Sequence, residues 1–469
     1  MSSVRRITET IALVICLVMF VRCVVIEPFG VPTGSMAMTM LGNHKACDCP
    51  RCGYRVTVGS SCKTPDDRRG FDRAYHGAWC PNCGYSQLPL AEVPETTGDR
   101  LLVDKTAFEY RKPRRWEVAV FRNPSDWSKP YVKRVVGLPN ERIQIRDGDV
   151  YVNDQLCRKT LAEVRPLRVL VFDQSCQPPQ TWRQRWVSGH LAGISALFED
   201  RHLSPLSEIP HGSNLFWPAS SVTAEERWLT YRHWLLDEER EEVIRDWFAY
   251  NGGAVRHELS EVHDFAAAFQ VEAAAGGGVL SLMMTDGRSL VQIELPIRDA
   301  NQNEPGFTVR GVPPPERLLR PPMLSPRQRH QIEIAFVDRR ISLAIDGQEV
   351  FSPIDLPADG MRRGVSRPIS LGARGPAVTI REFRLYRDVH YTQSGRNGIF
   401  DAWPLGSDEY FVLGDNSSNS EDSRHWLRPG VPFDFFVGRP LLLHQPSRWS
   451  QWGQWQLQSL DWQRIRWVR

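Results

Sequence analysis

The sequence lacks a strong excess of either charge. Its 58 Lys and Arg residues are balanced by 55 Asp and Glu residues, for a formal net charge of +3. A nearly neutral chain offers no electrostatic reason to expect nucleic-acid binding. Glycine and proline are modest, at 34 residues each in 469, and 41% of the residues are hydrophobic. This composition excludes collagen-like and disordered chains, and the length allows about three folded domains.

One long apolar run near the N-terminus predicts a single transmembrane helix over residues 7–27, behind a cytoplasmic N-terminus at 1–10. Arg22 interrupts the run, but an arginine near a helix end can extend its charge to the lipid headgroups. The positive-inside rule places Arg5 and Arg6 in the cytoplasm and the residues after the helix across the membrane. The alternatives are a cleaved signal peptide, for which the usual small-residue cleavage site is missing, and a buried core helix.

Cysteine is concentrated in residues 47–95, where two short motifs are nearly identical. Cys49 and Cys52 are separated by two residues and followed by Gly-Tyr, and Cys80 and Cys83 repeat this arrangement. Two residues between thiolates let one turn present both sulfurs to a single ion. The segment is therefore predicted to be a zinc-ribbon-like insertion with a structural, four-sulfur site.

A pair of disulfides is the alternative for these four cysteines, because the predicted topology puts the segment on the oxidising side of a membrane. Cys47 and Cys62 have no obvious place in a four-ligand site and add weight to that alternative. Cys157 and Cys176 stand apart and form a possible pair of their own.

Four short segments after the apolar run combine hydroxyl, lysine and acidic side chains: residues 27–36, 98–105, 131–139 and 414–424. In this order they resemble type I signal peptidases, the membrane-bound Ser/Lys endopeptidases that remove signal peptides from exported proteins. The resemblance covers a minority of the chain. It implies a β catalytic core in three parts, at residues 28–46, 96–156 and 383–446.

The resemblance also implies the role of each site residue. Ser35 aligns with the nucleophile and Lys133 with the general base. The supporting positions are Thr33 as an oxyanion donor beside the backbone N–H of Ser35, Ser420 as the hydroxyl that orients the lysine, Asp422 with Arg424 as a supporting pair, and Gly414, Asp415 and Asn416 as the segment that carries them.

The chemistry of such a site follows from the pKa values of its side chains. A serine hydroxyl is a poor nucleophile until a neighbouring base takes its proton, and a lysine is that base only if its pKa falls from about 10.4 toward 7 or 8. Desolvation lowers a lysine pKa because it disfavours the ammonium form. Residues 131–136 alternate as a half-buried strand would, which predicts apolar neighbours for Lys133.

Residues 157–382 form a second, larger insertion. Alternating runs at 269–273, 280–284, 290–295, 332–336 and 341–345 are separated by glycine-containing or short polar turns, a pattern typical of a β-sandwich. The pattern is loosely similar to laminin-G and concanavalin-like domains. A structural or protein-contact role is expected, with glycan binding as the alternative. The tail at 447–469 is rich in Trp and Arg, which suits either a membrane interface or packing on the core.

The predicted fold class is mainly β: a signal-peptidase-type core behind one transmembrane helix, with ribbon-like and sandwich-like insertions. The predicted function is removal of signal peptides from exported preproteins at the outer face of a bacterial cytoplasmic membrane. Catalysis needs no cofactor. The expected partners are signal peptides, the lipid bilayer and the secretion machinery, without nucleic acid. The alternatives are a self-cleaving Ser/Lys repressor-type protease and a catalytically silent envelope binding protein.

Overall fold

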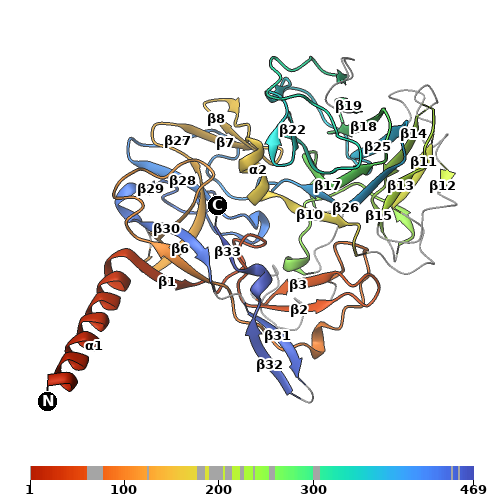
Figure 1. The fold of residues 1–469 in the computed structure, drawn as a ribbon. Coiled ribbons are helices and arrows are strands. Elements are labelled where there is room, and N and C mark those ends of the chain that lie inside the picture. Colours follow the sequence, from red (N-terminus) through yellow and green to blue (C-terminus); the bar gives the residue numbers. More distant parts are fainter. Residues whose placement is uncertain are drawn as a thin grey trace.

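The structure of the protein is a computed structural model. It describes residues 2–60, 78–123, 126–176, 185–189, 204–205, 214–221, 226–235, 238–252, 259–298, 307–444, 447–452 and 455–468. The described part holds two α-helices and 33 strands, so the expected mainly β class is confirmed. Figure 1 shows most of the strands gathered in two bodies, with α1 (Ser2–Phe20) projecting away from them. Cys62 lies outside the described residues.

The first body is built on an antiparallel sheet, here called the core sheet, with strand order β1-β4-β30-β5-β6-β28-β29 and β33 added beside β30. These strands come from distant parts of the chain: β1 (Ile26–Gly30), β4 (Arg100–Asp104), β5 (Val118–Asn123), β6 (Asp126–Gly137), β28 (Glu409–Leu413), β29 (Val431–Pro432), β30 (Phe436–Leu443) and β33 (Arg466–Trp467). A smaller sheet lies beside it, made of β7 (Arg142–Arg146), β8 (Asp149–Val152), β9 (Gln155–Leu156) and β27 (Trp403–Pro404). The core sheet therefore joins all three segments of the predicted catalytic core.

The second body, here called the two-sheet unit, consists of two antiparallel sheets that share one apolar core. The first sheet contains β10 (Val169–Asp173), β13 (Leu215–Trp217), β17 (Phe265–Ala273), β21 (Arg329–Val337), β22 (Arg340–Ile345), β23 (Gln348–Glu349), β24 (Ile354–Asp355) and β26 (Val378–Arg387). The second contains β11 (Trp186–Gly189), β12 (Ser204–Pro205), β14 (Arg227–Tyr231), β18 (Gly278–Thr285), β19 (Leu290–Ile297), β20 (Thr308–Arg310) and β25 (Ile369–Arg374). Alternate residues such as Phe269 and Leu282 meet between the sheets, as the period of two requires.

All five alternating runs singled out in the sequence lie within strands of this unit. The last strand differs from expectation, because β26 continues to Arg387 and so crosses the boundary predicted at residue 383. Its register explains the extension: Arg387 still pairs with Phe265 of β17 and with Val169 of β10.

The expected transmembrane helix over residues 7–27 is corrected by the structure. The α-helix α1 spans Ser2–Phe20, a single π-helical turn follows at Val21–Val25, and β1 begins at Ile26. The helix cannot continue because Ile26 already pairs with Asp104 of β4. Within the described residues, no helix combines the length and apolar character needed to cross a membrane.

The cysteine-rich segment forms a hairpin, β2 (His44–Asp48) with β3 (Arg55–Gly59), followed by the second cysteine motif. The two motifs repeat the same turn: the N–H of Cys49 donates to Tyr54, and that of Cys80 donates to Tyr85, each at 2.8 Å. Gly53 and Gly84 both adopt positive φ, at 72° and 82°. This left-handed conformation accounts for the glycine that closes each motif.

Short elements complete the described chain: α2 (Leu161–Leu167), the hairpins β15 (Trp234–Leu235) with β16 (Arg240–Glu241) and β31 (Ser447–Trp452) with β32 (Trp455–Leu460), and the 3-10 turns η2 (Leu90–Glu92), η5 (Ala249–Asn251), η7 (Ser417–Asn419), η8 (Phe433–Phe435) and η9 (Trp462–Arg464). In the tail, Trp462 and Trp467 are 73% and 67% exposed. Those two rings therefore do not pack into the core.

Candidate active site

Ser35 and Lys133 meet beside strand β6 of the core sheet, although 98 positions separate them in the sequence. Nζ of Lys133 lies 2.6 Å from Oγ of Ser35, with the amine donating to the hydroxyl oxygen. Lys133 lies on β6 opposite Ala119 of β5, and it is only 2% exposed. Burial lowers the pKa of Lys133 to about 8, although the charge of Asp422 opposes the shift. At that pKa a lysine supplies a neutral amine at mildly alkaline pH.

The turn that carries Ser35 is fixed by its apolar neighbours. Met36 and Met40 are buried against Leu101 and Val103 of β4. The N–H of Met40 donates to Met36 O at 2.8 Å, which closes the turn. Ser35 itself stays partly exposed. Its hydroxyl is therefore held in place and still open to a substrate.

The segment that begins with Gly414 packs directly on this turn. The N–H of Asn416 donates to Ser35 O at 3.1 Å, and its Nδ2 donates to Gly34 O at 2.9 Å. A Cβ on Gly414 would lie 2.2 Å from Ser420 Oγ and 2.5 Å from Ser35 O. Only glycine leaves room for this close approach.

Asp422 and Arg424 form the predicted pair, and both are fully buried. Nε and Nη2 of Arg424 donate to the two carboxylate oxygens at 2.8 Å each. Burial alone would raise the pKa of Asp422, but the ion pair with Arg424 outweighs it and holds that pKa well below its usual range. Asp422 also accepts from Gly414 N at 3.0 Å, so the pair supports the turn beside Ser35.

Asp415 has a partner that the sequence analysis missed. Arg134 donates to its two oxygens at 2.8 and 2.6 Å, and Thr39 Oγ1 donates to the same carboxylate. Arg134 is completely buried, and its partner is 1% exposed. Strand alternation could have indicated a separate partner for Arg134, because the residue after Lys133 must point to the opposite face of β6.

Within the described chain, no hydrogen bond joins the two remaining predicted residues to the Ser35–Lys133 pair. Ser420 Oγ is buried and has no hydrogen-bond partner among the described residues, so no bond to Lys133 is formed. Thr33 is exposed, and no hydrogen bond of its side chain is found in the described chain. The backbone N–H of Ser35 is likewise without a partner within the described ranges.

The four cysteines of the two motifs converge in the structure. Their sulfur atoms lie within 4.8 Å of one another, with 3.6 Å between Cys49 and Cys83 and 3.5 Å between Cys52 and Cys80. All four side chains are buried. A tetrahedral zinc site with Zn–S bonds of about 2.3 Å needs sulfurs roughly 3.8 Å apart, so the residues fit a zinc ion.

Disulfides are not formed by the described cysteines. The four clustered residues are free thiols, and so are Cys47, Cys157 and Cys176. The possible Cys157–Cys176 pair is therefore absent from this structure. Cys47 is buried beside the cluster without belonging to the four-sulfur group.

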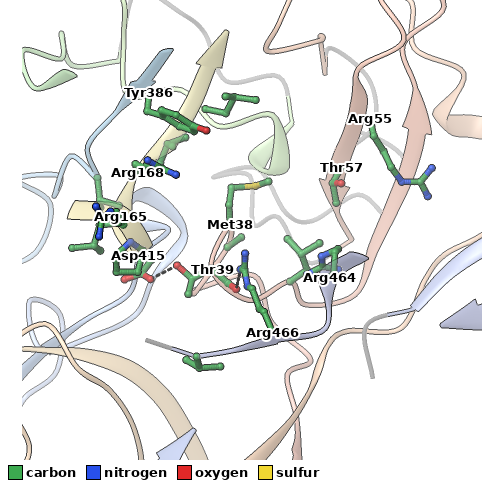
Figure 2. Close-up of a pocket in the computed structure, with 18 of the residues that line it drawn as sticks. Met38, Thr39, Arg55, Thr57, Arg165, Arg168, Tyr386, Asp415, Arg464 and Arg466 are labelled. Carbon is green, nitrogen blue, oxygen red and sulfur yellow. Dashed lines mark hydrogen bonds between the residues drawn. The ribbon is translucent and has the colours of Figure 1, made fainter. Parts of the chain in front are cut away.

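A separate cavity of about 650 Å³ lies behind the Ser35 turn. Figure 2 shows Arg165 and Arg168 on one side of it and Arg464 and Arg466 on another, with the Thr39–Asp415 hydrogen bond between them. Ser35 and Lys133 are not among its described lining residues. The cavity therefore adjoins the turn without containing the Ser35–Lys133 contact.

Residues 92–196 and 337–443 match the family described as "Signal peptidase, peptidase S26". The chain is similar to signal peptidases. Lys133 and the 414–424 segment lie inside the matched residues, and Ser35 lies before them.

Individual signal peptidase relatives give the same result. Signal peptidase I of Rickettsia conorii is 32% identical over 149 residues, which cover 32% of this chain and 43% of that protein. Signal peptidase I of Rickettsia akari is 31% identical over 211 residues, which cover 44% of this chain and 65% of that protein. The chain thus spans less than half the length of the first signal peptidase relative and less than two thirds of the second.

Among solved structures, apo Crh5 transglycosylase is 12% identical with a TM-score of 0.23, over 46% of this chain and 88% of that one.

Proposed function

We propose that the protein is a serine endopeptidase of the signal peptidase type, which removes signal peptides from exported preproteins. The observation that carries the proposal is the 2.6 Å contact between Ser35 Oγ and the buried amine of Lys133. The similarity to signal peptidases supports the substrate class. A site with a hydroxyl beside a desolvated amine suits peptide-bond hydrolysis through an acyl-enzyme.

In this mechanism neutral Lys133 takes the proton of Ser35 as Oγ attacks the scissile carbonyl carbon. The tetrahedral oxyanion is bound by the unpaired N–H of Ser35, with the hydroxyl of Thr33 as the second donor. Lys133 then gives its proton to the leaving amine, which departs as the new N-terminus of the mature protein. In the second step neutral Lys133 takes a proton from water as the water attacks the ester carbonyl of Ser35, and it gives that proton to Oγ as the ester bond breaks and the peptide acid leaves.

The four cysteines have a structural role in this proposal, as ligands of one zinc ion in a site separate from Ser35. When bound, the ion would crosslink the two motifs. Four cysteine ligands leave no open coordination position, so the catalytic steps involve only side chains and water.

A lipid surface is the proposed setting of the reaction. Several apolar side chains of α1 are more than half exposed: Ile7, Ile11, Leu13, Ile15, Leu17, Met19 and Phe20. Apolar area of this kind binds to the lipid interface. Contact with secretion machinery and a location at a bacterial cytoplasmic membrane stay predictions.

The test is incubation of the purified protein in detergent with a preprotein that carries an Ala-x-Ala site. The proposal predicts one cut after the second Ala, identified from the masses of both products. A preprotein that is bound but left intact would instead support the catalytically silent envelope binding protein.

A further inference from the structure

The 3-10 turn η5, in the insertion at 157–382, reaches the turn that carries Ser35. Tyr250 is completely buried, in a cluster with Ala37 and Leu41. Its ring occupies the space beside Gly34, where a Cβ would lie 2.2 Å from the ring atom Cε1. Because Gly34 directly precedes Ser35, the insertion contacts the chain next to the nucleophile.

Asn251, the next residue, forms a reciprocal amide pair with Asn416. Nδ2 of Asn251 donates to Oδ1 of Asn416 at 2.7 Å, and Nδ2 of Asn416 donates to Oδ1 of Asn251 at 2.7 Å. Nδ2 of Asn251 also donates to Ser418 Oγ at 2.9 Å. The pair requires that each side chain both donate and accept, which an amide does and a carboxylate does not.

Asn416 in turn forms hydrogen bonds to the backbone at Ser35 and Gly34. Its backbone N–H donates to Ser35 O, and its Nδ2 also donates to Gly34 O. Asn416 therefore binds two successive carbonyl groups, that of Gly34 through its side-chain amide and that of Ser35 through its backbone N–H. Asn251 is the side chain of the insertion that orients the Asn416 side-chain amide.

The segment that contains η5 is anchored to two other parts of the molecule. Trp247 stacks on Trp79 of the cysteine-rich segment, with ring centroids 4.6 Å apart. Arg387 of the two-sheet unit lies 4.4 Å from the ring of Phe248 and donates to Trp247 O at 3.1 Å. Both insertions thus hold η5 against the core sheet.

We propose that Asn251 is a positioning residue for the reaction, and that η5 is a built-in part of the active site rather than a linker between modules. Asn251 acts through Asn416 to hold the Ser35 turn at the distance that Lys133 requires. This inference rests on the proposed function. It predicts that the insertion sets the rate of the chemical step.

The test compares the wild type with Asn251→Asp and Asn251→Ala. The aspartate keeps the shape of the side chain but cannot donate to Asn416 Oδ1, so it disrupts the pair with the least effect on packing. Both variants should lower kcat about tenfold to a hundredfold, with little change in KM, because misplaced reacting groups slow the chemical step. The control Gln270→Ala removes an amide on β17, whose Nε2 donates to Glu382 at 3.3 Å, and should leave kcat unchanged.

A second readout does not depend on cleavage. Backbone amide exchange of residues 33–40, measured by mass spectrometry, should be faster in both Asn251 variants than in the wild type and in Gln270→Ala. Unchanged kcat in Asn251→Asp and Asn251→Ala would overturn the inference, and so would an equal loss of kcat in the control. If the wild type cleaves no preprotein, the proposed function fails, and unchanged exchange would then overturn the role of Asn251 separately.

Discussion

At the scale of single residues, the site depends on one lysine kept away from water. The ammonium form of Lys133 is disfavoured because this side chain of β6 is buried, and Ser35 is the hydroxyl placed to use the resulting amine. The nearby carboxylate of Asp422 does not cancel this effect, since it is already paired with Arg424. A charged side chain is thus converted into a base by its surroundings.

The pKa of Lys133 predicts the pH dependence of cleavage. Only the neutral amine accepts the proton of Ser35, so kcat/KM should rise with pH through about 8 and level off above it. At pH 7 the rate should be about a tenth of its maximum, as one unit below the pKa implies. Initial rates between pH 6 and 10 check this, and a rate that falls between pH 7 and 9 would contradict it.

Gly414 gives a prediction about packing. In Gly414→Ala the new methyl group would collide with Ser420 and with Ser35 O, so cleavage should be lost and stability should fall by about 1–3 kcal/mol. Gly30→Ala is the matched control, because nothing lies within 4 Å of a Cβ at that position. Equal activity of the two variants would show that the close approach at Gly414 is unimportant.

At the scale of elements, strand β6 serves two faces of the core sheet. Lys133 binds Ser35 on one face, and Arg134 pairs with Asp415 on the other, so one strand contacts both the Ser35 turn and the 414–424 segment. Thr39 joins the same carboxylate from the Ser35 turn. The site is therefore assembled by pairing between strands and turns rather than within one contiguous motif.

The buried ion pair can be tested by removing one partner. Arg134→Met leaves Asp415 buried without its partner, which should lower the free energy of unfolding by about 3–5 kcal/mol. Arg142→Met removes half of an exposed pair with Asp154, and its effect should stay below about 1 kcal/mol. Urea denaturation of both variants measures the difference. Equal urea denaturation midpoints for the two variants would mean that the Arg134–Asp415 pair contributes little to the free energy of unfolding.

The cysteine-rich segment carries a prediction about metal. The purified protein should contain about one zinc per chain, and a chelator should remove it and lower the melting temperature. Cys52→Ser should mimic the chelator, whereas Cys16→Ser should not, since Cys16 is exposed on α1. Less than one metal per chain in elemental analysis, with an unchanged melting temperature after chelation, would rule the site out.

At the scale of the whole molecule, the sequence predicted features that depend on local pattern. The mainly β class and the strands of the large insertion follow from alternation with a period of two. The cysteine turns follow from spacing and a glycine that accepts positive φ. Ser35 and Lys133 were identified from the resemblance to a family, and the structure brings them within hydrogen-bond distance.

Features that depend on tertiary contacts were not predictable. The end of α1 is set by pairing of Ile26 with β4, which apolar character alone does not reveal. The pair between Asn251 and Asn416 joins residues 165 positions apart, and nothing in the sequence near Asn251 marks it. The expected hydrogen bond between Ser420 and Lys133 is absent from the described residues, and Ser420 Oγ lies beside Gly414.

The central claim is that Ser35 and Lys133 together cut the preprotein, and the most direct measurement is cleavage by the wild type, Ser35→Ala, Lys133→Met and Lys112→Met. Lys112 is exposed and lies 5.3 Å from the ring of Phe433, so it serves as a matched lysine away from the site. The account predicts that the wild type and Lys112→Met cut after the second Ala, while the other two variants fold normally and cut nothing. Cleavage at the same bond by Ser35→Ala or Lys133→Met, at the wild-type rate, would contradict it.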